Sequence, residues 1–284
     1  MTAPAAPTLS PMCLPRAGAL TEALLGDGAT PSTDAVASAR RDLEHGLTDA
    51  AGRSGARPCL RVRAFDLVTA AGGGSSAATP FRWTTRTARR RVGLAALRAC
   101  LSEPGMVPAE AVALVVADPA APSGPGPAGP GSCSDWLCSL SPPARAAVQA
   151  ESTAWATAVW TSLEWDRVQP APVVGAPDRW WDWRGPVRVA LQGRADVRVP
   201  GPGGAHLVVL DGYPSAASRQ ALCFGPLVDA LRSNGAATPA RVVAWWPECG
   251  KAWVQQVDGA GLRACAGQVV RVVRLALDAT ERAG

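Results

Sequence analysis

The stretch that decides the fold runs from residue 193 to residue 247 and reads GRADVRVPGPGGAHLVVLDGYPSAASRQALCFGPLVDALRSNGAATPARVVAWWP. Residues 195–199 alternate in the way that predicts a strand with one buried face. The Pro/Gly-rich residues 200–204 predict a turn. Residues 206–211 then form an almost unbroken apolar run, which is typical of a strand buried on both faces. The two strands are therefore expected to pair as an antiparallel hairpin.

Two carboxylates lie at matching ends of this predicted hairpin. Asp196 comes near the start of the first strand, and Asp211 comes at the end of the second. In an antiparallel hairpin the start of one strand lies beside the end of the next, so both acids are expected at one edge of the sheet. Carboxylates brought together repel each other unless a cation or a shared proton holds them.

These residues resemble a motif of the PD-(D/E)XK nuclease superfamily, in its RecB-like branch. The branch has a G-x-x-D segment, matched by GRAD at 193–196, and three apolar residues before D-x-K, matched up to the acid by VVLD at 208–211. A helix with a glutamine follows, and Gln220 takes that place. The resemblance implies that Asp196 and Asp211 are catalytic residues that bind Mg²⁺, with Gln220 near the scissile phosphate.

The sequence departs from the motif at the catalytic lysine, because Tyr213 stands two residues after Asp211. In an active nuclease the acids hold Mg²⁺, and the lysine helps to position or deprotonate the attacking water. A phenol with a pKa near ~10 is neutral at pH 7 and adds no positive charge. We therefore expect a catalytically inactive protein of the nuclease fold that binds nucleic acid or a protein.

The alternative is a Mg²⁺-dependent DNA nuclease with a relocated lysine. Lys251 is the one lysine of the chain. The predicted strand order places it about two strand spacings, roughly 10 Å, from the acids. We expect that it does not reach them, so whether the protein is an enzyme stays open at this point.

The order of elements predicts an α/β fold, with a mixed sheet flanked by helices. It reads α-β-β-β-α-β-β-α, which is the order of a restriction-endonuclease-like core. Because a strand–helix–strand crossover joins the third and fourth strands, these two are expected to be parallel. The expected helices and strands cover residues 141–163, 187–191, 195–199, 206–211, 216–234, 241–246, 253–257 and 262–281.

Composition suggests three regions. Residues 1–118 are expected to form a mainly helical N-terminal region, with helices at 35–51, 84–101 and 108–116 and a strand at 61–68. Residues 119–140 form a Pro/Gly-rich linker. Residues 141–284 form the nuclease-like domain.

Two clusters are candidates for nucleic-acid contacts. Five arginines near the start of the helix at 84–101 could bind phosphates beside Trp83; they are Arg82, Arg86, Arg89, Arg90 and Arg91. The alternative for this cluster is a solvated helix face. The tryptophans at 180, 181 and 183 could stack on bases, but we favour a packing role for them.

The composition indicates a globular protein, with 48% hydrophobic and 18% charged residues among 284. The 27 arginines, in a chain rich in alanine, glycine and proline, suggest GC-rich, bacterial coding. The net charge of +5 is compatible with DNA or with a protein partner. We expect a cytoplasmic protein with free thiols, because the sequence shows no signal peptide, no membrane helix and no spacing typical of disulfides among its eight cysteines.

Overall fold

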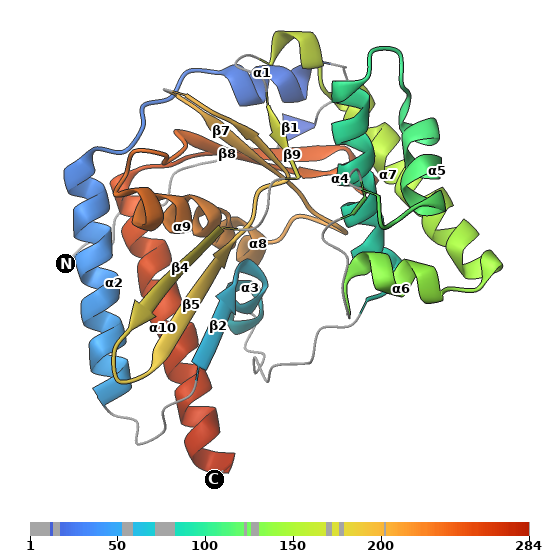
Figure 1. Cartoon of the computed structure of the whole chain (residues 1–284). Coiled ribbons are helices and arrows are strands. Elements are labelled where there is room, and N and C mark those ends of the chain that lie inside the picture. The colour runs from blue at the N-terminus through green and yellow to red at the C-terminus, as the bar shows by residue number, and fades with distance from the viewer. Residues whose placement is uncertain are drawn as a thin grey trace. The chain divides into compact units, whose positions relative to one another are not determined.

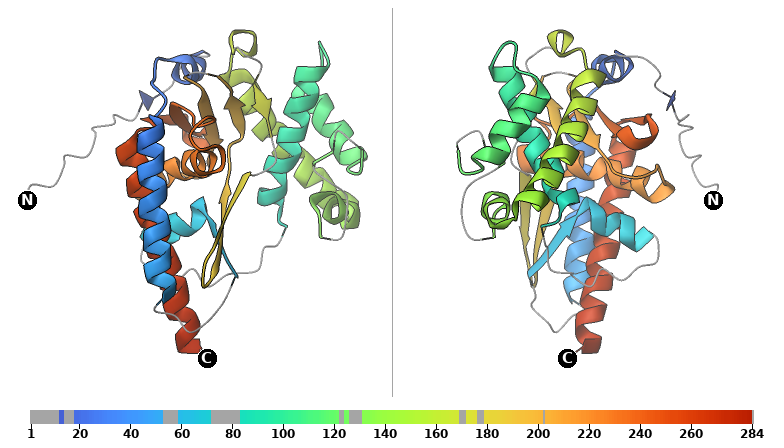
Figure 2. Two further views of the ribbon diagram at one scale, coloured as in Figure 1. Left: turned by 60° about the vertical axis from the view of Figure 1, so that its left-hand side comes forward. Right: turned by 90° about the vertical axis from the view of Figure 1, so that its right-hand side faces the viewer.

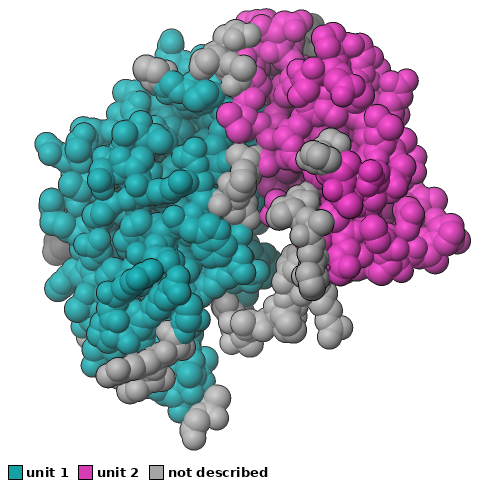
Figure 3. All heavy atoms as spheres, in the orientation of Figure 1, with its two compact units in different colours: residues 1–15, 22–79, 177–284 teal, residues 16–21, 80–176 magenta. Residues whose placement is uncertain are grey.

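The computed structural model describes residues 12–13, 18–52, 59–71, 83–121, 124–125, 131–168, 172–175, 179–201 and 203–283. The chain has an α/β fold, with mixed sheets flanked by helices (Figure 1). It divides into two compact units (Figure 3): residues 1–15, 22–79 and 177–284 form unit 1, and residues 16–21 and 80–176 form unit 2. The boundary at residue 21 falls within helix α1 (Ala19–Leu25).

These units differ from the three regions expected from composition. Helix α2 (Thr33–Gly52), strand β2 (Cys59–Arg63) and helix α3 (Ala64–Ala71) belong to unit 1, together with the C-terminal part of the chain. Strand β2 pairs in parallel with a strand more than a hundred residues away, and α2 lies along the C-terminal helix (Figure 2). Composition cannot predict such long-range pairing, because it reports only local preferences.

The larger sheet of unit 1 contains the predicted hairpin. Strands β6 (Val197–Val199) and β7 (Ala205–Val209) are antiparallel, as expected. Strand β8 (Arg241–Trp246) is parallel to β7, which confirms the crossover prediction, and β9 (Lys251–Gln256) is antiparallel to β8. The short strand β1 (Met12–Cys13) pairs with β9 at the edge.

A second sheet has the order β2-β5-β4. Strand β5 (Arg188–Gly193) was expected in the same sheet as the hairpin, but it pairs with β2 and with β4 (Arg179–Arg184) instead. At the end of β5, a Cβ atom on Gly193 would lie 2.8 Å from Val228 of the helix packed behind it. The glycine of the G-x-x-D segment therefore permits close packing between a helix and the sheet.

Helices fill the space behind the second sheet. The crossover helix begins as α8 (Ala216–Gln220), passes through a 3₁₀ turn and continues as α9 (Phe224–Ser233). Helix α10 (Gly259–Ala283) runs behind the sheet beside α2 (Figure 1). The buried core of unit 1 joins these helices to both sheets. Among its fully buried large side chains are Leu43, Leu47, Leu191, Phe224, Leu227, Leu231 and Trp246.

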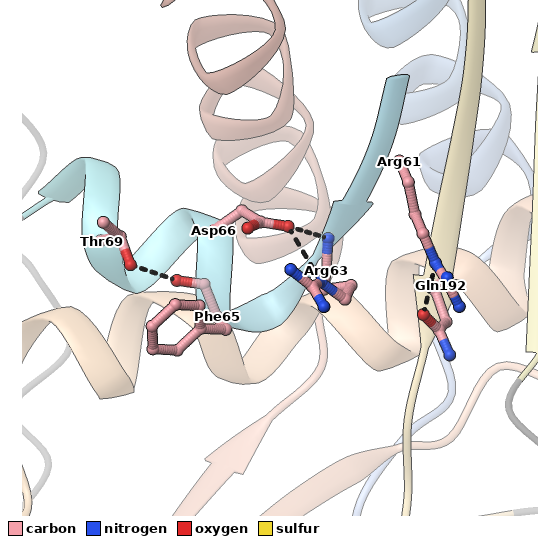
Figure 4. Close-up of polar contacts among 6 residues, drawn as sticks. All are labelled: Arg61, Arg63, Phe65, Asp66, Thr69 and Gln192. Carbon is pink, nitrogen blue, oxygen red and sulfur yellow. Dashed lines mark hydrogen bonds and ion pairs between the residues drawn. The ribbon is translucent and has the colours of Figure 1, made fainter. Parts of the chain in front are cut away.

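Strand β2 ends earlier than the pattern at 61–68 predicts, and a buried carboxylate explains why. The Oδ2 atom of Asp66 accepts the backbone N–H of Arg63 at 2.7 Å (Figure 4). This contact satisfies an N–H group at the first turn of α3, in the manner of half a capping box. The strand prediction is therefore wrong for residues 64–68, which are helical.

Unit 2 is mainly helical. Its main helices are α4 (Thr85–Ser102), α5 (Pro108–Ala117) and α7 (Pro142–Ser162), close to the expected ranges, and it contains the short strand β3 (Val173–Val174). Helix α6 (Cys133–Ser139) forms inside the stretch expected to be a linker. In the described parts of the chain, no helix has the length and apolarity that crossing a membrane requires.

Candidate functional site

Asp196 is completely buried, and its carboxylate is held from two sides. Its Oδ2 atom accepts the backbone N–H of Val209 at 2.8 Å and lies 3.3 Å from Nη2 of Arg194. The same Arg194 nitrogen donates to the carbonyl oxygen of Val209 at 3.0 Å. Asp196 therefore ties the start of β6 to the end of β7 and pairs with a guanidinium.

Asp211 lies beyond the end of the same hairpin. Val197 pairs with Leu207, so Asp196 falls opposite Val208, and Asp211 comes three residues later. The last two of these residues lie beyond the end of β7, so the strand ladder does not extend to Asp211. Both acids lie toward the same end of the hairpin, but Asp211 is not the cross-strand neighbour of Asp196. Asp211 is exposed, whereas Asp196 is not.

The loop after β7 contacts a carboxylate that the sequence analysis did not single out. The N–H of Gly212 donates to Oε2 of Glu248 at 3.0 Å. Gly212 has a φ of +76°, a conformation that suits glycine. Glu248 follows β8, which is parallel to β7, so both strands end at this edge. The sequence could have indicated this contact, because Asp211 and Glu248 each follow one of two strands that were predicted to be parallel.

The remaining residues of the motif occupy exposed or distant positions. Tyr213 is 76% exposed, and Gln220 is exposed at the end of α8. Lys251 pairs with Trp246 on β8, and the preceding β8 residue, Trp245, pairs with Val209. Lys251 is thus two strand spacings, roughly 10 Å, from the end of β7, as the strand order predicted.

Within the described part of the chain, no group of three or more His, Cys, Asp or Glu side chains is arranged to hold a metal ion. A site made by two acids and water would not form such a group. The role of Asp196 and Asp211 as metal ligands therefore stays a prediction.

The arginines of α4 are integrated into unit 2. Arg86 is exposed, while Arg89, Arg90 and Arg91 are half-buried, and all four have interactions within the protein. One of these places Nη1 of Arg89 3.9 Å from Glu151 of α7. Arg82 lies outside the described residues. This setting favours a structural role for most of the cluster.

A buried charge cluster that the sequence analysis missed links the two sheets of unit 1. Asp229, on α9, is 1% exposed. Its carboxylate lies 3.2 Å from Nη1 of Arg179 on β4, 3.8 Å from Nε of Arg198 on β6 and 3.1 Å from Nε2 of His206 on β7. Arg198 and His206 are cross-strand partners in the hairpin. The sequence could have indicated this cluster, because Arg198 and His206 lie in apolar strands and Asp229 lies in an apolar helix.

Burial lowers the pKa of His206 below its usual value, and the positive charges of Arg198 and Arg179 lower it further. Hydrogen bonding to Asp229 and the negative charge of its carboxylate raise the pKa, but burial is the largest effect. The imidazole is therefore neutral at pH 7, with Nε2 3.1 Å from Oδ2 of Asp229. Its Nδ1 atom is buried and has no hydrogen-bond partner in the described part of the chain.

The three tryptophans of β4 divide between the two faces of the second sheet. Trp181 and Trp183 pack against the core, as the favoured interpretation predicts. Trp180 points the other way and is 40% exposed. The packing prediction thus holds for two of the three rings.

Comparisons of the chain with protein-family models, with curated proteins and with solved structures find no match.

Proposed function

We propose that this chain is a nucleic-acid-binding protein built on a restriction-endonuclease-like core that does not cut its ligand. The observation that carries the proposal is the setting of Asp196. An acid that binds catalytic Mg²⁺ needs an oxygen open to the metal and to water. Asp196 is instead buried, with Oδ2 held by Val209 and Arg194.

The charge of Arg194 opposes a metal at this place. A guanidinium 3.3 Å from the carboxylate already balances its charge, and it would repel a divalent cation on the same oxygen. Tyr213 supplies no positive charge at the lysine position, and its ring is largely in solvent. The residues present therefore fit a structural ion pair better than they fit a Mg²⁺ site.

The binding half of the proposal is supported by charge. The chain has a net charge of +5, and 27 of its 28 lysine and arginine residues are arginines. Arginine suits phosphate because its planar fork donates two parallel hydrogen bonds. Electrostatic attraction of this kind supplies most of the affinity in non-specific binding to nucleic acid.

A second function, Mg²⁺-dependent DNA cleavage, is favoured by one observation. Glu248 contacts the backbone directly after Asp211, which brings a second carboxylate to this edge, and Lys251 begins β9 after the following turn. A relocated site would then use Asp211 and Glu248 as ligands, with Lys251 near the attacking water.

One pair of assays separates the two functions. Purified protein is titrated against labelled single- and double-stranded DNA and RNA, and each substrate is then incubated with Mg²⁺ or Mn²⁺. We expect binding that weakens with salt, and no cleavage. Cleavage that disappears in both Asp211→Asn and Glu248→Gln would establish the nuclease. Absence of binding to every nucleic acid would refute the proposed function.

The predicted α4 site is tested in the same titration. A variant with Arg86, Arg89 and Arg90 replaced by alanine binds as the wild type does if these arginines are structural. Weaker binding with a flatter salt dependence would show that they contact phosphates.

A further inference from the structure

The β2-β5-β4 sheet has one face packed on the core and one face turned away from it. Paired residues of neighbouring strands share a face, and every second residue along a strand returns to it. Val62, Val189 and Leu191 lie on the core side. The opposite side, here called the outer face, includes the row Trp180, Gln192 and Arg63.

The outer face is basic. Two residues along the strands, the next row contains Asp182 and Arg61. After two more residues, the third row contains Arg184 and Arg188. Four arginines and one aspartate give this face a formal charge of +3. Two of the arginines have carboxylate partners, since Arg188 lies 2.7 Å from Asp182 and Arg63 lies 3.5 Å from Asp66. Arg61 and Arg184 are both exposed.

An aromatic ring lies among these charges. Trp180 is the one aromatic residue at the nine paired positions of the outer face, all of which the structure describes. The guanidinium of Arg61 lies 4.4 Å from the centre of the Trp180 ring. The Nε atom of Arg61 donates to Oε1 of Gln192 at 3.0 Å (Figure 4). A hydrogen bond and a ring contact thus hold Arg61 in place before any ligand arrives.

We propose that the outer face binds single-stranded nucleic acid, with a base stacked on the Trp180–Arg61 pair and the backbone along Arg61 and Arg184. An exposed ring in a positively charged surface is what single-strand binders present, because bases stack on aromatic rings and on guanidinium planes. A base inside a duplex is already stacked on its neighbours and cannot cover the ring. An acidic protein would match the charge but would leave Trp180 without a planar partner.

The arrangement also lowers the cost of binding. Ordering a long side chain at an interface costs free energy, and Arg61 is already held by Gln192 and Trp180. Gln192 is the cross-strand neighbour of Trp180, so the residue that holds Arg61 also lies beside the ring.

The inference rests on the proposed function, and the test distinguishes failure of the one from failure of the other. Labelled oligothymidylate, oligouridylate and a DNA duplex of the same length are titrated by fluorescence anisotropy at several salt concentrations. The variants are Trp180→Ala, Trp180→Phe and the pair Arg61→Ala/Arg184→Ala. Trp136→Ala on α6 is the tryptophan control, and Arg263→Ala/Arg271→Ala, two exposed positions on α10, removes the same charge elsewhere. Circular dichroism confirms that each variant is folded.

We expect the wild type to prefer both single strands over the duplex. Trp180→Ala should weaken single-strand binding by about fivefold to a hundredfold. Trp180→Phe should retain most of the wild-type affinity, because a base stacks on the face of either aromatic ring. The Arg61→Ala/Arg184→Ala variant should flatten the slope of log affinity against log salt by about 0.7 for each phosphate that is no longer neutralised. The Arg263→Ala/Arg271→Ala control should keep the wild-type slope. The relative affinities of the DNA and RNA strands then show which of them is the ligand.

Four results would overturn the inference. Single-strand binding that is unchanged in Trp180→Ala and in the Arg61/Arg184 pair would place the site elsewhere and leave the proposed function intact. Duplex binding as tight as single-strand binding would refute the stacking argument. Polyglutamate that binds as tightly, with the same weakening in Trp180→Ala, would point to an acidic protein. If no nucleic acid binds the wild type, the proposed function fails together with the inference.

Discussion

The Nε2 atom of His206 on β7 lies 3.1 Å from the Oδ2 atom of Asp229 on α9, and both side chains are almost completely buried. The same carboxylate lies near Arg179 of the second sheet and Arg198 of the hairpin. One acid therefore connects α9 to both sheets of unit 1. Since it faces two arginines, protonation of His206 would add a third positive charge around a single negative one.

Replacing Asp229 should destabilise the protein strongly. Asp229→Ala leaves two guanidinium groups and an imidazole without their shared acceptor, and breaking a buried ion pair in this way costs about 3–5 kcal/mol. Chemical denaturation measures the change in the free energy of unfolding. Asp278→Ala, at an exposed position on α10, is the matched control and should change it by less than about 0.5 kcal/mol. Equal effects of the two substitutions would contradict the structural role of Asp229.

The cluster should also make stability depend on pH. The pKa of His206 is lowered in the folded protein, so below its usual value near ~6.5 the unfolded chain takes up a proton that the folded chain does not. The contribution of His206 is fully present above that pH and is lost as the pH falls toward the folded pKa, by at most about 1.4 kcal/mol per pH unit. His206→Gln can still donate to Asp229 but does not titrate. The free energy of unfolding is measured for the wild type and for His206→Gln at neutral and at mildly acidic pH. It should fall less on acidification in the variant than in the wild type. An unchanged slope would show that His206 does not couple to folding.

The two acids of the nuclease-like motif should behave differently. Asp196→Asn removes the charge paired with Arg194 in a buried position, and should lower the free energy of unfolding by about 1–3 kcal/mol. Asp211→Asn changes an exposed residue and should have an effect within about 0.5 kcal/mol. Thermal melts with Mg²⁺ and with a chelator form the second measurement. Stabilisation by Mg²⁺ that both substitutions abolish would show that the acids share a metal.

Gly193 should tolerate no larger residue. Gly193→Ala places a Cβ atom 2.8 Å from Val228, so α9 or β5 must shift, and overpacking of this kind costs about 1–3 kcal/mol. Gly267→Ala on α10, where a Cβ atom meets nothing within 4 Å, should instead be neutral or stabilising. Denaturation midpoints of the two variants test this contrast. Equal midpoints would mean that α9 adapts without cost.

Thiol reactivity should separate the cysteines by burial. Burial raises the pKa of Cys133 and Cys223 to about 12 and raises that of Cys265 as well, so these thiols stay protonated near neutral pH. Cys59 and Cys138 are exposed. In a kinetic assay with a chromogenic disulfide reagent, we expect the exposed thiols to react first and the buried ones only on unfolding. Fast reaction in a Cys13→Ser/Cys59→Ser/Cys138→Ser variant, beyond that of the half-buried Cys249, would contradict this order.

Local patterns were sufficient for most individual elements. The alternation at 195–199 and the apolar run at 206–211 predicted β6 and β7, and the crossover rule predicted that β8 would be parallel to β7. These predictions succeed because each depends on neighbouring residues and on chirality. The strand predicted at 61–68 failed in its second half, where the Asp66 side chain caps α3.

The sequence by itself determined the hairpin, the crossover and most of the helices, because apolar periodicity and turn residues act within a few positions along the chain. Only the tertiary structure decided that β5 pairs with β2 in a second sheet, that Asp196 pairs with Arg194, and that Asp229 is surrounded by basic groups from three strands. Each of these facts depends on which distant groups become neighbours when water is excluded. The sequence does not show whether a carboxylate lies in solvent or beside a guanidinium. Only folding, which buries some carboxylates and leaves others in water, decides which environment each one has.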